Sequence, residues 1–371
     1  MKKYFGLFLL VIALVVNSCI EPFSPPEVNN GESFLVIDGF LNVGGDTSRI
    51  KLSNTQNTND DAQPVYEGNA VIMAESERGE TFNFEEQPGG NYFLPPVNLD
   101  ADTKYRLYIR RINGSEYRSE YVVVTKTPPI DSLTYKLDKN REAMVVYVNT
   151  HDATNNTRFY RWRFEETYEY KTAFYSGLDR DYQTKTVISR KEDISRCWRT
   201  LESKDIKLGS TIKLSQDIIK DLPINIIYIG TNKLLHKYSI MVRQYALSRE
   251  AFEYWTDLAK TTQGTGSLFD PQPSQVTGNI RNIKDAKELV FGYFSASTEE
   301  TQRIFIAPAL GTYPRCMPPD TLMPHEAFDS YGVLLNSFVT EAGATYLLSS
   351  SEFCADCRAQ GGTITRPSYW R

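Results

Sequence analysis

The chain has 371 residues, 41% hydrophobic and 12% aromatic, so it is long enough to bury a core and to divide into two domains. Its formal charge is −5, or −7 once Lys2 and Lys3 leave with the leader described below, and no block of lysine and arginine stands out. This composition argues against a nucleic-acid partner.

The first residues, MKKYFGLFLLVIALVVNSC, are typical of an export signal. Lys2 and Lys3 form a basic start, and the apolar run from Tyr4 to Val16 is too short to cross a bilayer of about 30 Å as a mature helix. We therefore predict a signal peptide over residues 1–18.

The end of this leader differs from an ordinary secretory cleavage site. In place of small residues in the A-x-A pattern it has Val16-Asn17-Ser18-Cys19, which resembles a bacterial lipobox. Cys19 would then be the first mature residue, with a diacylglycerol on its sulfur and usually a further acyl chain on its amine, and two such signals suffice for stable anchoring. An uncleaved N-terminal anchor, or a plain signal peptide with a chance cysteine, remains the alternative.

Residues 19–32 are rich in proline and polar residues and have no apolar period, so they predict a flexible tether. No later run approaches the length of a membrane helix. The acyl chains on Cys19 are therefore the membrane attachment that we predict.

Residues 33–127 contain short alternating runs separated by turn residues, which is typical of antiparallel strands. Arg78-Gly79 and Asn113-Gly114 each fall between two such runs and predict hairpins. We expect an immunoglobulin-like or transthyretin-like sandwich here. Pro128-Pro129 then marks a plausible domain boundary.

Residues 128–371 predict a larger β-rich domain with one prominent helix, so the whole chain is expected to be mainly β. The helix should run from about residue 249 to 261, because Ser248 is a good N-cap and Phe252, Trp255, Leu258 and Ala259 share one face. Two apolar runs around Thr298-Glu299-Glu300 predict a further hairpin. There is no repeat of fixed period and no heptad pattern.

Several stretches together resemble a known family. They are SCIEPF near the start, then YSIMVRQYALSREAFEYW, GSLFDPQPSQVTGNI, GYFSAS and RIFI, and finally CADCRAQGGTITRPSYW at the end of the sequence. These are similar to a Bacteroidota lipoprotein family built on domain of unknown function 4249. The resemblance implies an outer-membrane lipoprotein, often encoded beside a TonB-dependent transporter, and it implies no established activity.

Four cysteines remain after Cys19, namely Cys197, Cys316, Cys354 and Cys357. An even number in an exported chain favours disulfides, and four cysteines allow three connectivities. We favour an arrangement in which Cys354 and Cys357 attach the tail to Cys316 and Cys197, because a tail with little core gains most from cross-links. One bridge with free or metal-bound thiols, or a redox pair, is the alternative.

Residues suited to catalysis or metal binding are sparse. The three histidines are read as a turn residue (His151), a position alternating within a strand (His236) and a loop residue (His325), and no known catalytic motif occurs. Oxygen-rich segments around Asp60, Asp61, Asp100 and Asp102 lack the EF-hand spacing and favour solvated loops.

The adjacent Glu165 and Glu166 on a predicted strand raise the question of glycoside hydrolysis. Neighbouring strand positions point to opposite faces, however, so the two carboxylates cannot share one substrate. We therefore predict no catalytic residue, no cofactor and no metal.

These expectations point to a non-enzymatic lipoprotein on the outer membrane, on its periplasmic side or at the cell surface. It would be a binding or accessory subunit of an envelope complex, with a β-barrel protein such as a TonB-dependent transporter as partner. A surface protein that binds a glycan or a peptide is the first alternative, and an unrecognised hydrolase is the second.

Overall fold

A computed structural model describes residues 33–55, 65–263, 276, 278–307 and 309–371. Residues from Phe34 to Arg371 form one compact unit. The predicted leader and tether, with Cys19, lie outside the described residues, as do Asp60 and Asp61.

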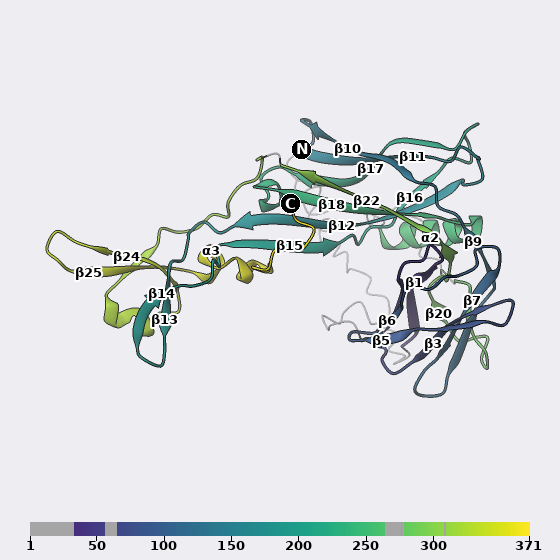
Figure 1. The fold of residues 1–371 in the computed structure, drawn as a ribbon, viewed down its shortest axis with the longest axis horizontal. Coiled ribbons are helices and arrows are strands. Elements are labelled where there is room, and N and C mark those ends of the chain that lie inside the picture. Colours follow the sequence, from purple (N-terminus) through teal and green to yellow (C-terminus); the bar gives the residue numbers. More distant parts are fainter. Residues whose placement is uncertain (1–32, 56–64, 264–275, 277, 308) are drawn as a thin grey trace, which may run out of the picture. The chain divides into compact units, whose positions relative to one another are not determined.

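The N-terminal part of this unit is a sandwich-like arrangement of short strands (Figure 1). Alternate residues of its first strands, such as Leu35 and Ile37, are buried in one core. This is the period of two expected for strands with one buried face. The strands are β1 (Leu35–Asn42), β2 (Ser48–Asn54), β3 (Val71–Ser76), β4 (Thr81–Asn83), β5 (Glu85–Gln87), β6 (Asn91–Leu94), β7 (Lys104–Arg110), β8 (Glu116–Ser119) and β9 (Val122–Thr125).

Both hairpins predicted in this part are confirmed. β3 pairs with β4 across the turn that contains Gly79, and β7 pairs with β8 across the turn that contains Gly114. The two glycines have φ angles of 92° and 83°, a region that glycine adopts without the steric cost other residues meet.

Three strands from late in the sequence complete this first sheet. β19 (Ile280–Asn282) pairs with β8, β20 (Val290–Phe291) with β1, and β21 (Ala296–Ser297) with both β1 and β9. Part of the expected 128–371 domain therefore belongs to the N-terminal sheet. Local alternation identifies a strand but does not say which distant strand it pairs with.

The hairpin predicted around Thr298 is wrong for the same reason. The run before Thr298 is β21 in the first sheet, whereas the run after it is β22 (Glu299–Ile306), which pairs with β18 (Tyr238–Ala246). The chain thus passes from one sheet to another at this point instead of turning back on itself.

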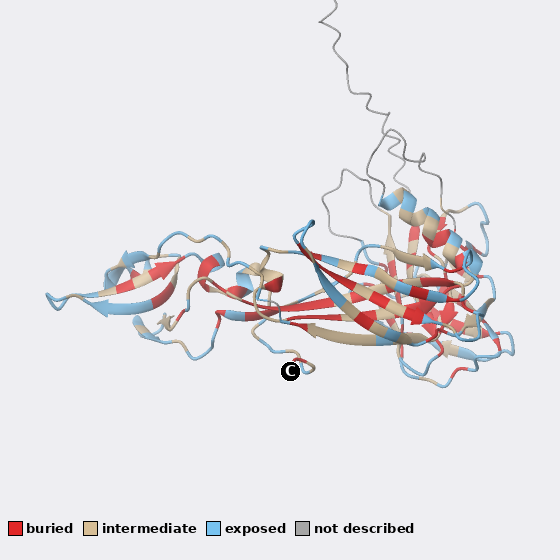
Figure 2. Cartoon of the chain, turned by 90° about the horizontal axis from the view of Figure 1, so that it is seen from above, coloured by how far each residue is buried: buried red, intermediate tan, exposed pale blue. Residues whose placement is uncertain are grey.

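The second region consists of two sheets that share one core. The smaller has the order β10-β11-β17, and the larger has the order β15-β12-β18-β22 with β16 also paired to β12. Figure 2 shows buried residues alternating with partly buried or exposed ones along the long strands of the molecule. The strands not yet bounded are β10 (Ile130–Asp138), β11 (Ala143–His151), β12 (Phe159–Lys171), β15 (Arg196–Glu202), β16 (Lys207–Ser210) and β17 (Ile218–Tyr228).

The predicted helix is confirmed as α2 (Arg249–Thr262). The Ser248 side chain caps its start by accepting a hydrogen bond from the Ala251 N–H at 3.2 Å. Tyr254 and Trp255 are buried against Phe159 of β12. The helix therefore covers part of the β12 face that points away from the shared core.

Two small sheets, one from late in the sequence and one from its middle, pack together as a separate layer. β24 (Val333–Val339) and β23 (Asp320–Leu322) flank β25 (Thr345–Ser350), and β13 (Leu178–Asp181) pairs with β14 (Thr186–Ser189). Their buried core consists of three side chains, Ala327, Leu334 and Leu347. The Arg180 guanidinium holds the two parts together by donating to the Gly332 carbonyl at 2.6 Å.

Candidate functional site

All four cysteines after Cys19 are paired as disulfides. Cys197 in β15 joins Cys357 at the start of the 3-10 turn η3 (Cys357–Gln360), and Cys316 joins Cys354 in α3 (Glu352–Ala355). The Cα atoms of the two pairs are 5.6 and 5.9 Å apart. Each tail cysteine is thus joined to one upstream cysteine, which is the connectivity favoured from the sequence.

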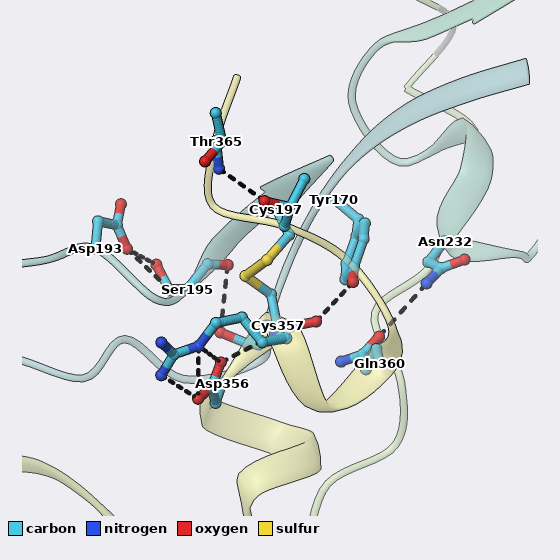
Figure 3. Close-up of a disulfide and its surroundings, with 12 residues drawn as sticks. Tyr170, Asp193, Ser195, Cys197, Asn232, Asp356, Cys357, Gln360 and Thr365 are labelled. Carbon is cyan, nitrogen blue, oxygen red and sulfur yellow. Dashed lines mark hydrogen bonds and ion pairs between the residues drawn. A yellow bond between two sulfur atoms is a disulfide. The ribbon is translucent and has the colours of Figure 1, made fainter. Parts of the chain in front are cut away.

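The tail around Cys357 is also held by hydrogen bonds. The Tyr170 hydroxyl lies beside the bridge in Figure 3 and donates to the Cys357 carbonyl at 2.6 Å. Trp198 and Thr363 exchange two backbone hydrogen bonds of 2.9 Å. The tail therefore continues the edge of the larger sheet next to β15.

The last residues of the chain cover the outer face of β12, by which we mean the face turned away from the shared core. Trp370 is 4% exposed, and its indole N–H donates to Glu169 at 3.2 Å. The Arg303 guanidinium lies 3.7 Å above the Tyr369 ring. A tail that was expected to have little core of its own is thus closely packed at its end.

Large apolar side chains are exposed on the small C-terminal layer and the segments next to it, which we call the stapled module (residues 175–189 and 313–353). Tyr331 is 99% exposed and Met317 is 82% exposed. Of the 24 large apolar side chains exposed by the described residues, ten are in this module, although it is a small part of the chain. They are Tyr175, Tyr182, Ile188, Tyr313, Met317, Met323, Tyr331, Phe338, Val339 and Phe353.

A cleft of about 410 Å³ opens between the first sheet and the outer face of the larger sheet. Charged side chains of both signs line it from both sheets, and we call it the charged cleft. Those lining it include Asp38, Arg49, Lys51, Arg163, Glu202, Arg243 and Glu299.

The strand register explains why charges gather in this cleft. Even-numbered residues of β12, such as Trp162 and Phe164, enter the shared core, so odd-numbered residues face outward. Arg163 on β12 lies directly opposite Arg243 on β18, and like charges in that relation are destabilising. Asp38, 3.5 Å from Arg163, and Glu299, 3.2 Å from Arg243, offset this repulsion.

Tyr245 joins the two sheets at the inner end of the cleft. Its hydroxyl donates to Glu299 at 2.6 Å, and its ring packs edge-on against Phe40 of β1 with centroids 4.7 Å apart. Burial, followed by the Glu299 charge, raises the pKa of Tyr245. The phenol therefore stays protonated and remains a hydrogen-bond donor at neutral pH.

Arg161 lies deeper than the other cleft cations and is unpaired. Its guanidinium carbon is 3.4 Å from the centroid of the Trp255 ring, and its buried Nε has no hydrogen-bond partner. Within the described residues, no carboxylate forms an ion pair with it. Burial lowers the pKa of Arg161 to about 10, so the group is still a cation at neutral pH.

Glu165 and Glu166 point to opposite faces of β12, as predicted. Glu165 pairs with Arg303 at 2.7 Å on the outer face. Glu166 is 5% exposed within the shared core, where it accepts hydrogen bonds from Lys233 and Tyr238. The two carboxylates cannot act on one glycosidic bond in this arrangement.

The histidines lie in three separate places. His151 is the last residue of β11, and its Nδ1 is 2.8 Å from Asp131. His236 was expected within a strand, but it lies in the connection between the 3-10 turn η1 (Asn232–Leu234) and β18. His325 is in another 3-10 turn, η2 (Pro324–Phe328), where a loop was expected.

The acidic segment around Asp100 is bound by its own surroundings. Asp100 pairs with Arg78 and also accepts the Asp102 N–H at 2.8 Å. In the part of the chain that the structure describes, no group of three or more histidine, cysteine, aspartate or glutamate side chains could hold a metal ion. No described helix has the length and apolar character needed to span a membrane.

No sequence motif marks Asp38, Arg161, Arg163 or Arg243. A signal for Arg161 and Arg163 was present in FYRWRFEETYEYK, where charged residues alternate with aromatic ones along a strand. Such alternation indicates a polar outer face. It does not indicate that a second sheet covers that face.

Comparison with known proteins identifies a family but no activity. The family model described as Domain of unknown function (DUF4249) matches residues 20–303. No curated protein matches the chain. Among solved structures, the native conformation of E. coli alpha-2-macroglobulin has 10% identity and a TM-score of 0.17, covering 60% of this chain and 14% of that one.

Proposed function

We propose that this chain, which belongs to the DUF4249 family, acts without catalysis as a binding or accessory subunit of a cell-envelope complex. The leader supports attachment through an acylated Cys19, and the resemblance described above supports the outer membrane as its location. The proposed partner is an integral β-barrel of that membrane, such as a TonB-dependent transporter.

The observation that carries this proposal is the stapled module. Soluble monomeric proteins rarely gather large exposed apolar side chains in one place, and such patches often mark contacts with other proteins. The buried apolar cluster of the module consists of three side chains, whereas ten large apolar side chains are exposed, and a disulfide between Cys316 and Cys354 constrains the module. A partner would cover apolar surface that is otherwise exposed to water.

The lipid anchor supports a partner in the same membrane. A protein held on a membrane meets other proteins of that membrane at a high effective concentration, so a modest contact area suffices. Integral proteins of the bacterial outer membrane are β-barrels, which makes a barrel the expected partner class.

Purification of the tagged full-length protein from native membranes tests this proposal. We expect one β-barrel protein to co-purify, and replacement of both Tyr331 and Met317 by serine to reduce its yield. Tyr228→Ser is the matched control, because Tyr228 is 59% exposed but lies on β17, outside the module. Absence of any barrel, or equal loss with the control, would contradict the proposal.

The lipid anchor is tested separately with Cys19→Ala. Metabolic labelling with a fatty-acid analogue should tag the native protein and leave the variant unlabelled. A variant that is still labelled would show that another residue carries the lipid.

Capture of a glycan or peptide ligand is the second candidate function, and the charged cleft favours it. Its volume of about 410 Å³ lies in the range of small-molecule sites. Arg161, which lines a small adjoining cavity, has no ionic partner among the described residues. Hydrolysis lacks comparable support, because Glu165 and Glu166 lie on opposite faces of β12.

A further inference from the structure

A small cavity lies at the inner end of the charged cleft, between β1, β12, β18 and β21. Its volume is about 20 Å³, and Arg161, Gly39 and Ser297 are among the residues lining it. It shares Asp38, Arg163 and other lining residues with the larger cleft, so the two spaces lie next to each other.

The unpaired charge of Arg161 calls for an anion in this cavity. A buried charge without a partner is costly, and buried guanidinium groups are normally met by carboxylates or phosphates. Stacking on Trp255 offsets part of this cost but forms no hydrogen bond with the five N–H groups. On the same face of β12, Arg163 and Glu165 have ionic partners among the described residues, whereas the more deeply buried Arg161 has none.

The β1 backbone supplies a further donor on this side. Leu52 directs its N–H away from β1 to the Gly90 carbonyl, so the Ile37–Leu52 pair is not hydrogen-bonded across the ladder. The alternation of an antiparallel pair then turns the Gly39 N–H away from β2, toward the side of β1 where β20 and β21 lie. Gly39 itself lines the cavity.

The size and charge of the cavity select the kind of anion. About 20 Å³ is room for one water-sized group, which suits a single carboxylate oxygen better than a tetrahedral phosphate. Asp38 lines the same cavity, and its negative charge disfavours a dianion next to it. A monoanionic carboxylate is therefore the best match.

The larger cleft indicates what carries that carboxylate. Its walls offer charged and amide side chains such as Asn91, Arg243 and Glu202, which can hydrogen-bond to hydroxyl groups. β2 is paired on both sides here, to β1 and to β6, so it has no free edge on which a peptide could add as a strand. These features favour a sugar over a peptide.

We propose that Arg161 and the adjoining cavity bind the carboxylate of an acidic sugar, a uronic acid, whose remaining hydroxyls occupy the charged cleft. This inference rests on ligand capture, the second candidate function above, and does not depend on the partner proposed for the stapled module. The carboxylate enters as an ion, and no bond is made or broken.

Calorimetric titration of the full-length protein in detergent tests this site. The probes are a uronic-acid trisaccharide, its fully methyl-esterified form, an acidic tripeptide and inorganic phosphate. We expect the free acid to bind, and esterification to weaken binding about tenfold or more, since hydrogen bonds to charged groups are worth that much.

Arg161→Gln should weaken binding of the free acid by about the same factor and leave the weak binding of the ester unchanged. Arg158→Gln is the matched control, because Arg158 precedes β12, donates to the Thr211 and Leu214 carbonyls and lies outside the cavity. Ser295→Leu is a second variant, which fills the cavity without removing the charge and should also weaken binding.

Several results would overturn the inference. These are equal binding of acid and ester, no effect of either cavity variant, tighter binding of phosphate or the tripeptide than of the sugar, and no binding by any probe. This experiment does not depend on co-purification of a barrel. A failure of the uronic-acid proposal can therefore be distinguished from a failure of the partner proposal.

Discussion

The stapled module and the charged cleft use opposite chemistry at their surfaces. The module buries three side chains in its own core and exposes apolar rings, whereas the cleft lies between two large cores and is lined by charges. Exposed apolar area favours association with another protein, and a concave polar site with an unpaired cation favours a small ligand. One chain can therefore have two separate binding surfaces, and the following experiments test whether they are independent.

Removal of the Cys316–Cys354 bridge by alanine substitution of both cysteines should have the largest effect on the stapled module. Loss of a native disulfide typically costs about 2–5 kcal/mol of unfolding free energy, and the module has little core to compensate. We expect limited proteolysis to cut first within residues 313–353. Uronate binding in the cleft should be unchanged.

The double alanine variant of Cys197 and Cys357 is the control for this experiment. That bridge spans 160 residues rather than 38, so its removal should destabilise the whole unit at least as much, as measured by urea unfolding. If loss of the 38-residue bridge also abolished cleft binding, the two surfaces would not be independent.

Ser248→Ala should have an intermediate effect, confined to the cleft side. Loss of an N-cap hydrogen bond costs about 1 kcal/mol, and α2 carries Trp255, which stacks on Arg161. We expect faster amide exchange in the first turn of α2 and weaker uronate binding. Ser351→Ala is the matched control, since Ser351 precedes α3 and its side chain makes no capping hydrogen bond.

Titration of His151 and His236 should give the smallest effects, with opposite signs. Asp131 raises the pKa of exposed His151. The stability that this pair contributes is therefore complete below the pKa of His151 in the unfolded chain, and it is lost as the pH rises through the pKa of His151 in the folded protein. Burial lowers the pKa of His236. The stability linked to its neutral form is therefore complete above the pKa of His236 in the unfolded chain, and it is lost as the pH falls through the pKa of His236 in the folded protein. Histidine NMR titrations measure both.

Asp131→Asn is the variant that checks the cause of the first shift. It should return the pKa of His151 toward about 6.5, the usual value for histidine, while His236 is unaffected. A shift of His151 that persists in the variant would show that another group is responsible.

Local features of the fold could be predicted where one short stretch of chain determines them. The hairpins at Gly79 and Gly114 follow from glycine at positive φ, and α2 follows from Ser248 and one apolar face. The pairing of β20 and β21 with β1 could not be predicted, because a two-residue strand has no pattern that specifies a partner more than 240 residues away. For the same reason, the sequence did not show that the strands before and after Thr298 pair with different sheets.

The candidate site was less accessible to sequence reasoning than the fold. Cysteine number and compartment led to the observed pairing of Cys354 and Cys357 with upstream residues. In contrast, Arg161 and Arg163 are indistinguishable in sequence, since both alternate with aromatic residues on β12. Only the packing of β1 against β12 places Asp38 beside Arg163 and leaves Arg161 against Trp255 without a carboxylate.

By itself, the sequence determined the β-rich character of the chain, its one long helix, its hairpin turns and the polar outer face of β12. These depend on period, turn chemistry and capping, which act over a few residues. Which sheet the late strands join, which apolar residues stay exposed and which arginine of β12 lacks an ionic partner depend on the tertiary structure. These features depend on contacts between residues far apart in the chain. Such contacts contribute to the free energy of folding only once the sheets have packed together.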